Sequence, residues 1–258
     1  MWLAQISDMH VTREGEGTDY GGDTGRALAR CLRHMASIAP APAAVIASGD
    51  LANDGTAEQY ARLRSLLAGL PVPVYVIPGN HDRRDALRAA FRDQQYLPES
   101  GALCYAVACG PLQLIALDTL VEGEEGGQLD AAQLDWLSAT LARLAGSPTI
   151  VVMHHPPVRT GIASMDAIAL DAESATRFGA IVERSPQMVR ILCGHVHRDL
   201  HAHWRGIGVS VCPSTAFQTS LAFIPAPFAA DCSQPSAYFA HHWNGSELVT
   251  HSVSVPGE

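Results

Sequence analysis

Short apolar runs recur along the chain and are rich in Val, Ile, Leu and Ala. They cover residues 2–7, 43–48, 74–78, 112–117, 149–153 and 189–193. Runs of this length that are apolar almost throughout are typical of strands in a sheet buried on both faces. The pattern therefore predicts a series of buried strands.

Longer segments with helical character lie between several of these strands. They cover residues 24–38, 56–70, 82–94, 130–145 and 166–184. In the fourth segment, leucines recur at helical spacing (positions 134, 137, 141 and 144) behind an acidic start at Asp130. Alternation of strands and helices predicts an α/β fold with mixed or parallel sheets.

The pattern changes from Gly206 onward, where helical periodicity disappears. Residues 206–218 and 236–255 have strand character, and the second stretch predicts a hairpin that turns at Asn244-Gly245. A Pro-broken apolar loop at 224–230 separates them. We therefore expect a core over residues 1–205 and a β-rich C-terminal segment over residues 206–258.

Composition narrows the classes of protein to which the chain can belong. Of its 258 residues, 47% are hydrophobic and 17% are charged, which argues against extensive disorder. The net charge of −9 argues against broad electrostatic binding of duplex nucleic acid or of an anionic membrane. No apolar run approaches the ~20 residues of a membrane helix, and no secretory signal precedes the first strand. We expect a cytoplasmic protein whose six cysteines are reduced.

Side chains that can bind metals follow five of the predicted strands. They are Asp8 and His10; Asp50 and Asn53; Asn80, His81 and Asp82; His154 and His155; and His195 and His197. In open α/β sheets, ligands bind outside the carboxyl ends of the strands. We therefore expect the five strand ends to converge on one crevice.

Each of these residues has a simpler explanation when it is considered alone. An Asp after a strand is commonly a turn former or a helix cap, and a Gly there commonly marks a loop. The simpler explanation would have to hold five times, always with ligand-type side chains, which favours a single site. We interpret Asp118 as a turn or cap residue, because no second ligand type accompanies it. His241 and His242 are interpreted as structural or interfacial, because no carboxylate matches them.

The residue types indicate the chemistry of the site. Imidazole, carboxylate and carboxamide without thiolate describe a site for Zn²⁺, Mn²⁺, Fe or Co²⁺. So many ligands suit two ions, which a shared carboxylate would hold ~3.5–4 Å apart. We take Asp50 as the bridge, because it stands at a tight strand exit. Two divalent ions against two carboxylates leave a cationic pocket, which suits a phosphate ester and a hydroxide that attacks it.

The five groups resemble the five motifs of the calcineurin-like metallophosphoesterases. The matching stretches are Asp8-x-His10, Gly49-Asp50-x-x-Asn53, Gly79-Asn80-His81-Asp82, His154-His155-Pro156-Pro157 and Gly194-His195-x-His197. They stand in the family's order and span residues 8–197. The compact chain and stretches such as "MHHPPV" look most like the bacterial branch of class III cyclic-nucleotide phosphodiesterases and glycerophosphodiesterases.

The resemblance implies how the ligands divide between two ions. Asp8, His10 and His197 would hold one ion, Asn80, His154 and His195 would hold the other, and Asp50 would bridge them. His154 is preferred to His155 because the family's ligand is the first residue of a His-x-Pro sequence.

The resemblance also implies roles around the metals. Asp50, Asn80 and His81 would be catalytic, and His81 would approach the phosphate or the leaving oxygen. Asn53, Asn80 and His81 would contact the substrate, although Asp54 is an alternative to Asn53. Asp82 would cap the next helix or orient His81.

The family's fold and activity complete the expectation. The fold would be a four-layer α/β/β/α sandwich of two mixed sheets flanked by helices. Residues 206–258 would complete the second sheet and contribute to a cap or a subunit interface of a homo-oligomer. The activity would be hydrolysis of small phosphodiesters, either cyclic nucleotides such as cAMP or glycerophosphodiesters, by a metal-bridging hydroxide, with Fe and Mn favoured over Zn and Co.

Two other functions are weighed against this one. A phosphomonoesterase or protein phosphatase is the first, but the "DRG" sequence typical of protein phosphatases is replaced by "LANDG" after the second motif. A metal-binding interaction module without catalysis is the second, but such a protein should have lost ligands or the His81 position, and this chain keeps them.

Overall fold

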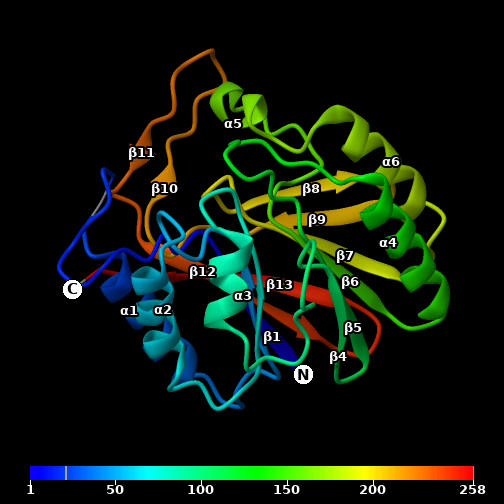
Figure 1. Ribbon diagram of the computed structural model, residues 1–258, viewed down its shortest axis with the longest axis horizontal. Coiled ribbons are helices and arrows are strands. Elements are labelled where there is room, and N and C mark those ends of the chain that lie inside the picture. The colour runs from blue at the N-terminus through cyan, green and yellow to red at the C-terminus, as the bar shows by residue number, and fades with distance from the viewer. Residues whose placement is uncertain (21, 258) are drawn as a thin grey trace.

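Two mixed β-sheets lie face to face, and helices cover their outer faces (Figure 1). The computed structural model describes residues 1–20 and 22–257. The arrangement has four layers, helix, sheet, sheet and helix, as the resemblance implied. The predicted α/β/β/α sandwich is therefore confirmed.

The first sheet has five strands in the order β13-β12-β1-β2-β3. They are β1 (Trp2–Ile6), β2 (Val45–Ser48), β3 (Val74–Ile77), β12 (Ser236–Trp243) and β13 (Leu248–Val255). Strands β1, β2 and β3 run parallel to one another, and β12 pairs antiparallel with both β1 and β13. Helices α1 (Thr24–Ala36), α2 (Ala57–Leu67) and α3 (Arg84–Ala90) pack on its outer face.

The second sheet has six strands in the order β4-β5-β6-β7-β9-β8. They are β4 (Tyr105–Cys109), β5 (Leu112–Leu117), β6 (Thr149–Met153), β7 (Met188–Cys193), β8 (Leu200–Trp204) and β9 (Ile207–Val211). Strands β5, β6, β7 and β9 are parallel, and the two edge strands are antiparallel. Helices α4 (Ala131–Arg143), α5 (Ala163–Ala167) and α6 (Ala172–Val182) cover its outer face.

Side-chain alternation along the strands builds three apolar layers. On β1, Leu3 enters the core between the sheets while Ala4 and Ile6 face the helices. On β6, Val152 points between the sheets and Val151 points to α4 and α6. Each central strand is buried on both faces, which is why these runs are apolar almost throughout.

Several predicted elements change in detail. The predicted helix 166–184 is two helices, because Asp171 caps a new one at Ala172 and accepts a hydrogen bond from the Ser174 main-chain N–H at 2.9 Å. Strands β4 and β8 were not predicted. Among the described helices, none is long and apolar enough to cross a membrane.

The chain beyond Gly206 contributes to both sheets. Strand β9 pairs with β7 and β8, whereas β12 and β13 form a hairpin that extends the first sheet beyond β1. The hairpin turns at Asn244-Gly245, as predicted. Between them lies the two-stranded ribbon of β10 (Gln218–Thr219) and β11 (Ala230–Asp231). The boundary between residues 205 and 206 stays a prediction.

Candidate metal centre

The five strand exits meet at one end of the two facing sheets. The loops after β1 and β2 are joined by main-chain hydrogen bonds, Asp8 N–H to Gly49 O at 3.0 Å and His10 N–H to Asp50 O at 2.9 Å. Across the sheets, the His195 N–H donates to the Asp8 carboxylate at 3.0 Å. The predicted convergence thus brings residues from both sheets into one cluster.

An unusual backbone conformation marks these exits. Six non-glycine residues in the described chain have positive φ, and five of them are Asp8, His10, Asp50, His195 and His197. Their φ values lie between 42° and 72°. The left-handed region costs an L-residue about 1–2 kcal/mol, although Asp and His tolerate it better than most. The strain turns each side chain sharply out of its strand and into the crevice.

The first cluster consists of Asp8, His10, Asp50 and His197, whose ligand-type atoms lie within 4.8 Å of one another. The His10 and His197 Nε2 atoms are 3.1 Å apart. His10 Nε2 lies 3.5 Å from Asp50 Oδ2, and His197 Nε2 lies 3.5 Å from Asp8 Oδ1. All four residues are buried. This set includes the residues that the resemblance assigns to the first ion and the proposed bridge.

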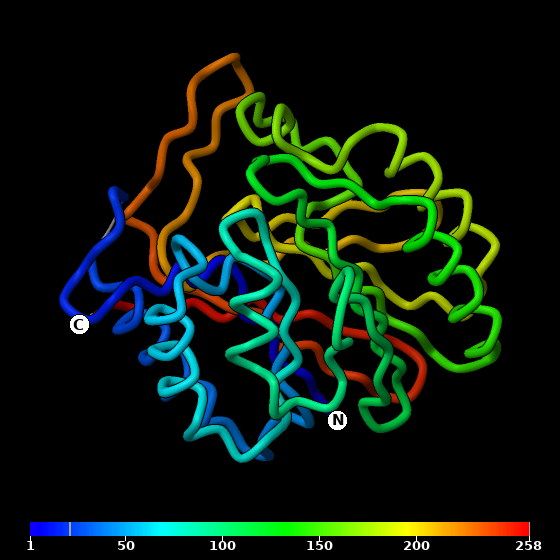
Figure 2. The backbone as a smooth tube through the Cα atoms, viewed as in Figure 1, coloured from blue at the N-terminus to red at the C-terminus, as the bar shows by residue number. Residues whose placement is uncertain are grey.

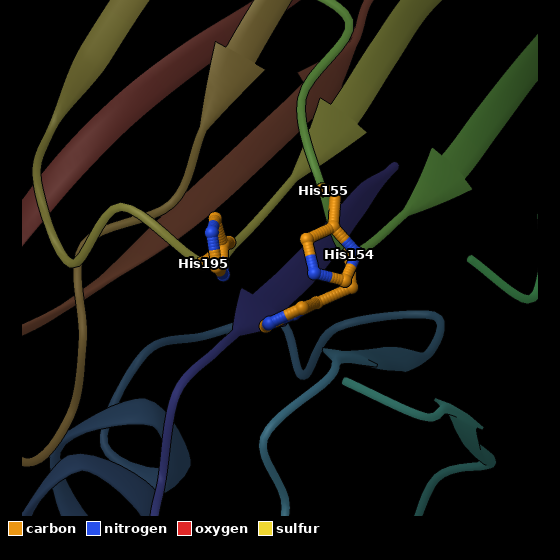
Figure 3. A group of neighbouring side chains, drawn as sticks. All are labelled: His154, His155 and His195. Atoms are coloured by element: carbon orange, nitrogen blue, oxygen red, sulfur yellow. The ribbon is translucent and has the colours of Figure 1, made fainter. Parts of the chain in front are cut away.

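The second cluster gathers around the Asn80 side-chain oxygen. Asn80 Oδ1 is 3.2 Å from His154 Nε2 and 3.1 Å from His195 Nδ1. His154 Nε2 is also 3.4 Å from Asp50 Oδ2. His154 leaves the exit of β6 and His195 leaves the exit of β7, and their rings approach each other beside that of His155 (Figure 3). Asp50 therefore stands between the two clusters, as expected for a shared ligand.

Hydrogen bonds fix the tautomers of two histidines. His154 Nδ1 lies 2.8 Å from Ser48 O, and His197 Nδ1 lies 2.9 Å from Phe217 O. A carbonyl only accepts, so both Nδ1 atoms carry a proton, and Nε2 is the atom of each ring that faces the cluster and would bind a metal. This is the usual arrangement behind a metal-bound imidazole.

The electrostatics of the clusters suit bound cations. Burial raises the pKa of the Asp8 carboxyl, and neighbouring His197 and His154 offset this only in part. Burial opposes protonation of His154, but the Asp50 carboxylate outweighs it and raises the pKa of His154 to about 9. Burial holds the pKa of His10 well below its usual value, so its lone pair is available. Buried carboxylates beside converging lone pairs fit two divalent ions, which would supply the missing positive charge.

His81 stands at the solvent-exposed edge of the first cluster. Its ring meets the ring of His10 edge-on, with centroids 4.5 Å apart. Its Nδ1 lies 2.8 Å from Asn53 O, so Nδ1 carries a proton and Nε2 stays free. Burial lowers the pKa of His81, but Asp50 and the hydrogen bond to Asn53 outweigh this and raise it. The main-chain N–H of His81 also donates to Asp50 Oδ1 at 2.9 Å.

Asn53 and Asp54 take separate positions. The Asn53 side-chain amide donates to Asp54 Oδ1 at 3.1 Å, and Asp54 Oδ2 accepts from the Gln59 amide at 2.7 Å. Asp54 is thus bound to the start of α2, and the contact between Asn53 and His81 is made by the main-chain carbonyl.

The predicted roles of Asp82 are wrong. Its carboxylate accepts from Leu51 N, Ala52 N and Gly79 N and from the Tyr60 hydroxyl, at 2.8–3.2 Å. The N-cap residue of α3 is Arg83, which makes no side-chain cap. Asp82 therefore joins the loops after β2 and β3 instead of capping the helix or contacting the His81 ring.

The residues interpreted as structural keep that role. Asp118 is buried, accepts from the Leu103 and Leu120 main-chain N–H groups, and pairs with Arg84 at 2.6 Å. His241 is buried at the first sheet, with Nε2 2.9 Å from Gln5 Oε1, whereas His242 is exposed. Neither histidine joins the metal clusters.

Three glycines that were interpreted as loop markers leave space for side chains at the metal centre. A Cβ on Gly49 would overlap the His154 ring, one on Gly79 would overlap Asp50 Oδ1, and one on Gly194 would overlap Ser7 Oγ and lie 2.9 Å from Asp8 Oδ2. The sequence signal was present, since each glycine directly precedes a candidate ligand. The Phe217 carbonyl had no such signal, because it is a main-chain atom.

Most of the chain is similar to proteins of known families. Residues 1–199 match the calcineurin-like phosphoesterase family. A probable glycerophosphodiester phosphodiesterase of Arcobacter nitrofigilis is 31% identical over 258 residues, which cover 100% of this chain and 94% of that protein. A 3′,5′-cyclic-nucleotide phosphodiesterase of a Nostoc species is 28% identical over 216 residues, 84% of this chain and 79% of that protein.

A solved structure shares the fold. The dimetal phosphatase from Danio rerio superposes with a TM-score of 0.68 at 12% identity and covers 99% of each chain. Family match, sequence relatives and a cluster of Asp and His residues at the strand exits lead to one conclusion. This chain belongs to the calcineurin-like phosphoesterase family.

Proposed function

We propose that the protein is a dinuclear metal-dependent phosphodiesterase that hydrolyses small phosphodiesters. The observation that carries the proposal is the pair of ligand clusters that share Asp50, with His81 at their exposed edge. The proposed metal ligands are Asp8, His10, Asp50 and His197 for one ion and Asp50, Asn80, His154 and His195 for the other.

The side chains divide the work around the reacting phosphate. Two ions bound here would neutralise the charge of the diester and supply a hydroxide near neutral pH. The His81 main-chain N–H donates to Asp50 and holds it in place, and the Nδ1–H of the His81 ring donates to the Asn53 carbonyl. The ring therefore offers Nε2 to the reaction. The raised pKa of His81 favours a second proton on this atom, and that proton can pass to the alcohol oxygen that leaves.

The identity of the metals belongs to this proposal. The donor set of imidazole, carboxylate and one carboxamide, without thiolate, suits Fe, Mn, Zn or Co. Of these we propose Fe or Mn, which the resemblance to the family favours. Elemental analysis of protein purified without added metal is the direct measurement. Chelation should abolish activity, and one of these ions should restore it.

Two substrate classes fit the proposal, because the relatives differ in the substrate that their names give. The experiment is a panel assay on metal-loaded protein with 3′,5′-cyclic AMP, 2′,3′-cyclic AMP, glycerophosphoethanolamine, a bis-aryl phosphate and a mono-aryl phosphate. We expect the highest kcat/KM on a diester. Monoester turnover far above that of every diester would establish the phosphomonoesterase alternative. No turnover with two bound ions would favour the interaction module.

We also propose that the C-terminal segment forms a subunit contact in a cytoplasmic homo-oligomer. The arm between β10 and β11 projects from the body of the molecule (Figure 2). Its apolar side chains Leu221, Phe223 and Ile224 are 53%, 73% and 71% exposed. Light scattering on the parent and on an F223S/I224S double variant tests this, and the variant should have a lower mass.

A further inference from the structure

His195 differs from the other proposed histidine ligands in how its ring is held. His154 and His197 each donate Nδ1–H to a carbonyl. His195 turns Nδ1 toward Asn80 Oδ1, and its buried Nε2 has no hydrogen-bond partner within residues 1–20 and 22–257. A metal-bound imidazole is normally held by a hydrogen bond at its other nitrogen. The orientation of this ring therefore depends on its packing.

The ring of His155 provides that packing. The centroids of His155 and His195 are 4.4 Å apart at an angle of 51°, and those of His155 and His154 are 4.9 Å apart at 87°. His155 thus touches both imidazoles of the second cluster (Figure 3). Because the side chain is fully buried, no solvent separates these rings.

His155 is itself firmly held and has no lone pair to offer a metal. Its Nε2 lies 3.1 Å from Glu125 O, so Nε2 carries the proton. Its Nδ1 then accepts from the Thr119 hydroxyl at 2.8 Å. The backbone of Gly127 presses against the ring, since a Cβ there would lie 2.5 Å from Cγ of His155. Both nitrogens are occupied, although the ring lies within reach of the cluster.

We infer that His155 is a positioning residue, which sets the orientation of the His195 ring by packing and thereby the affinity of the second metal position. The loop of residues 119–127 acts through the same ring, because Thr119, Glu125 and Gly127 all contact it. The inference rests on the proposed ligand set and adds a residue that touches neither metal nor substrate.

Two variants separate the ring from its hydrogen bonds. His155→Gln keeps a polar side chain but removes the ring, whereas His155→Phe keeps a ring but removes both hydrogen bonds. Metal-free protein is titrated with Mn²⁺ by calorimetry, and the affinities of the two positions are compared. His34→Ala is the control, because it removes a histidine that hydrogen-bonds to the Tyr238 hydroxyl rather than to any metal ligand.

We expect His155→Gln to weaken the second position about 10–100-fold, the usual cost of a lost orienting partner, and to change the first less than about twofold. The second-position affinity of His155→Phe should stay within about threefold of the parent value, and that of His34→Ala should equal the parent value. The inference would be overturned if His155→Gln kept the Mn²⁺ affinity of the parent or lost affinity equally at both positions. It would also be overturned if His155→Phe lost as much affinity at the second position as His155→Gln. If the parent itself binds fewer than two ions, the proposed function fails first.

Discussion

Left-handed backbone at five ligand positions is the distinctive feature at the scale of single residues. The turns that place Asp8, Asp50 and His195 cost backbone energy, and the sheets on which they stand supply the stability that holds them. The adjoining glycines are required because side chains of other ligands occupy the space where their Cβ atoms would lie. Packing at these exits therefore leaves room for the ligands and for little else.

Gly79→Ala tests this crowding. A Cβ at this position would overlap Asp50 Oδ1 and lie 2.7 Å from His154 Nε2, so both side chains must move. We expect kcat/KM to fall about 10²-fold, because displacements of about 1 Å at a catalytic centre cost this much, and we expect less than two ions per chain. Gly69→Ala is the matched control, since nothing lies within 4 Å of its added Cβ. Full activity in Gly79→Ala would contradict the crowding argument.

The third motif should separate binding from chemistry. Asn80→Ala removes the oxygen at the centre of the second cluster, so we expect weaker binding of one metal and lower turnover. His81→Ala keeps the main-chain N–H that holds Asp50. We expect both ions to remain while kcat falls about 10²–10⁴-fold, the range for a lost general acid. Metal content and steady-state kinetics of the two variants are the measurements, and loss of an ion in His81→Ala would make His81 a ligand.

At the scale of elements, apolar runs predicted β1, β2, β3, β5, β6 and β7, whereas the two edge strands of the second sheet, β4 and β8, were missed. The runs of β1, β2, β3, β5, β6 and β7 are central or buried on both faces, so hydrophobicity alone marks them. Edge strand β8 reads Leu-His-Ala-His-Trp, and its alternate residues are exposed, which gives the signal of a half-buried strand instead. The break in the helix predicted over 166–184 was missed, because a capping Asp within an apolar segment has little effect on periodicity.

A substitution of Asp82 tests how strongly its carboxylate joins the loops after β2 and β3. Its carboxylate accepts four hydrogen bonds, from three main-chain N–H groups and from the Tyr60 hydroxyl. In Asp82→Asn, an amide NH₂ would face two of these donors, so we expect the free energy of unfolding to fall by about 3 kcal/mol. Urea unfolding measures the change. Asp85→Asn, whose side chain is fully exposed, should stay within about 0.5 kcal/mol of the parent.

At the scale of the whole molecule, a buried polar network joins the two sheets behind the metal clusters. Gln5 on β1 donates its amide to Cys193 O on β7 at 2.9 Å and to Ser48 Oγ at 2.9 Å, and it accepts from His241 on β12 at 2.9 Å. The Gln5 amide uses both of its protons, so its oxygen accepts and His241 Nε2 is the donor. The side chain of Gln5 thus connects β1, near the start of the chain, to β7 and β12, which come much later in the sequence.

His241 should make stability depend on pH. Burial, helped by nearby Arg190 and His201, lowers the pKa of His241 to about 3 from a usual value of 6.5. The unfolded chain therefore binds a proton between these values while the folded chain does not, so stability is lost as pH falls below 6.5. At pH 5 the loss from this residue is about 2 kcal/mol.

Urea unfolding of His241→Gln at pH 7.5 and pH 5 measures this dependence. The variant should lose less stability than the parent on acidification, by about 2 kcal/mol. His242→Gln is the control, because this neighbouring side chain is exposed. Parallel pH profiles for the parent and His241→Gln would show that His241 is protonated in the folded protein.

The convergence of the five exits was predictable, whereas the path of the C-terminal segment was not. A general property of α/β sheets and the order of the motifs were sufficient to bring residues 8 to 197 together. The β-rich character of the tail was recognised, but local patterns do not specify a distant strand partner. Only pairing across the molecule determines that β9 joins one sheet and that β12 and β13 join the other.

The place of β1 within its sheet has a consequence for synthesis on the ribosome. It pairs with β2 on one side and on the other with β12, whose His241 contacts Gln5 across 236 residues of sequence. A nascent chain that has passed His197 already carries every proposed ligand, yet one edge of β1 is still bare and open to wrong partners. We therefore expect this edge of β1 to be covered, and the first sheet to be completed, only after the C-terminal hairpin has left the exit tunnel.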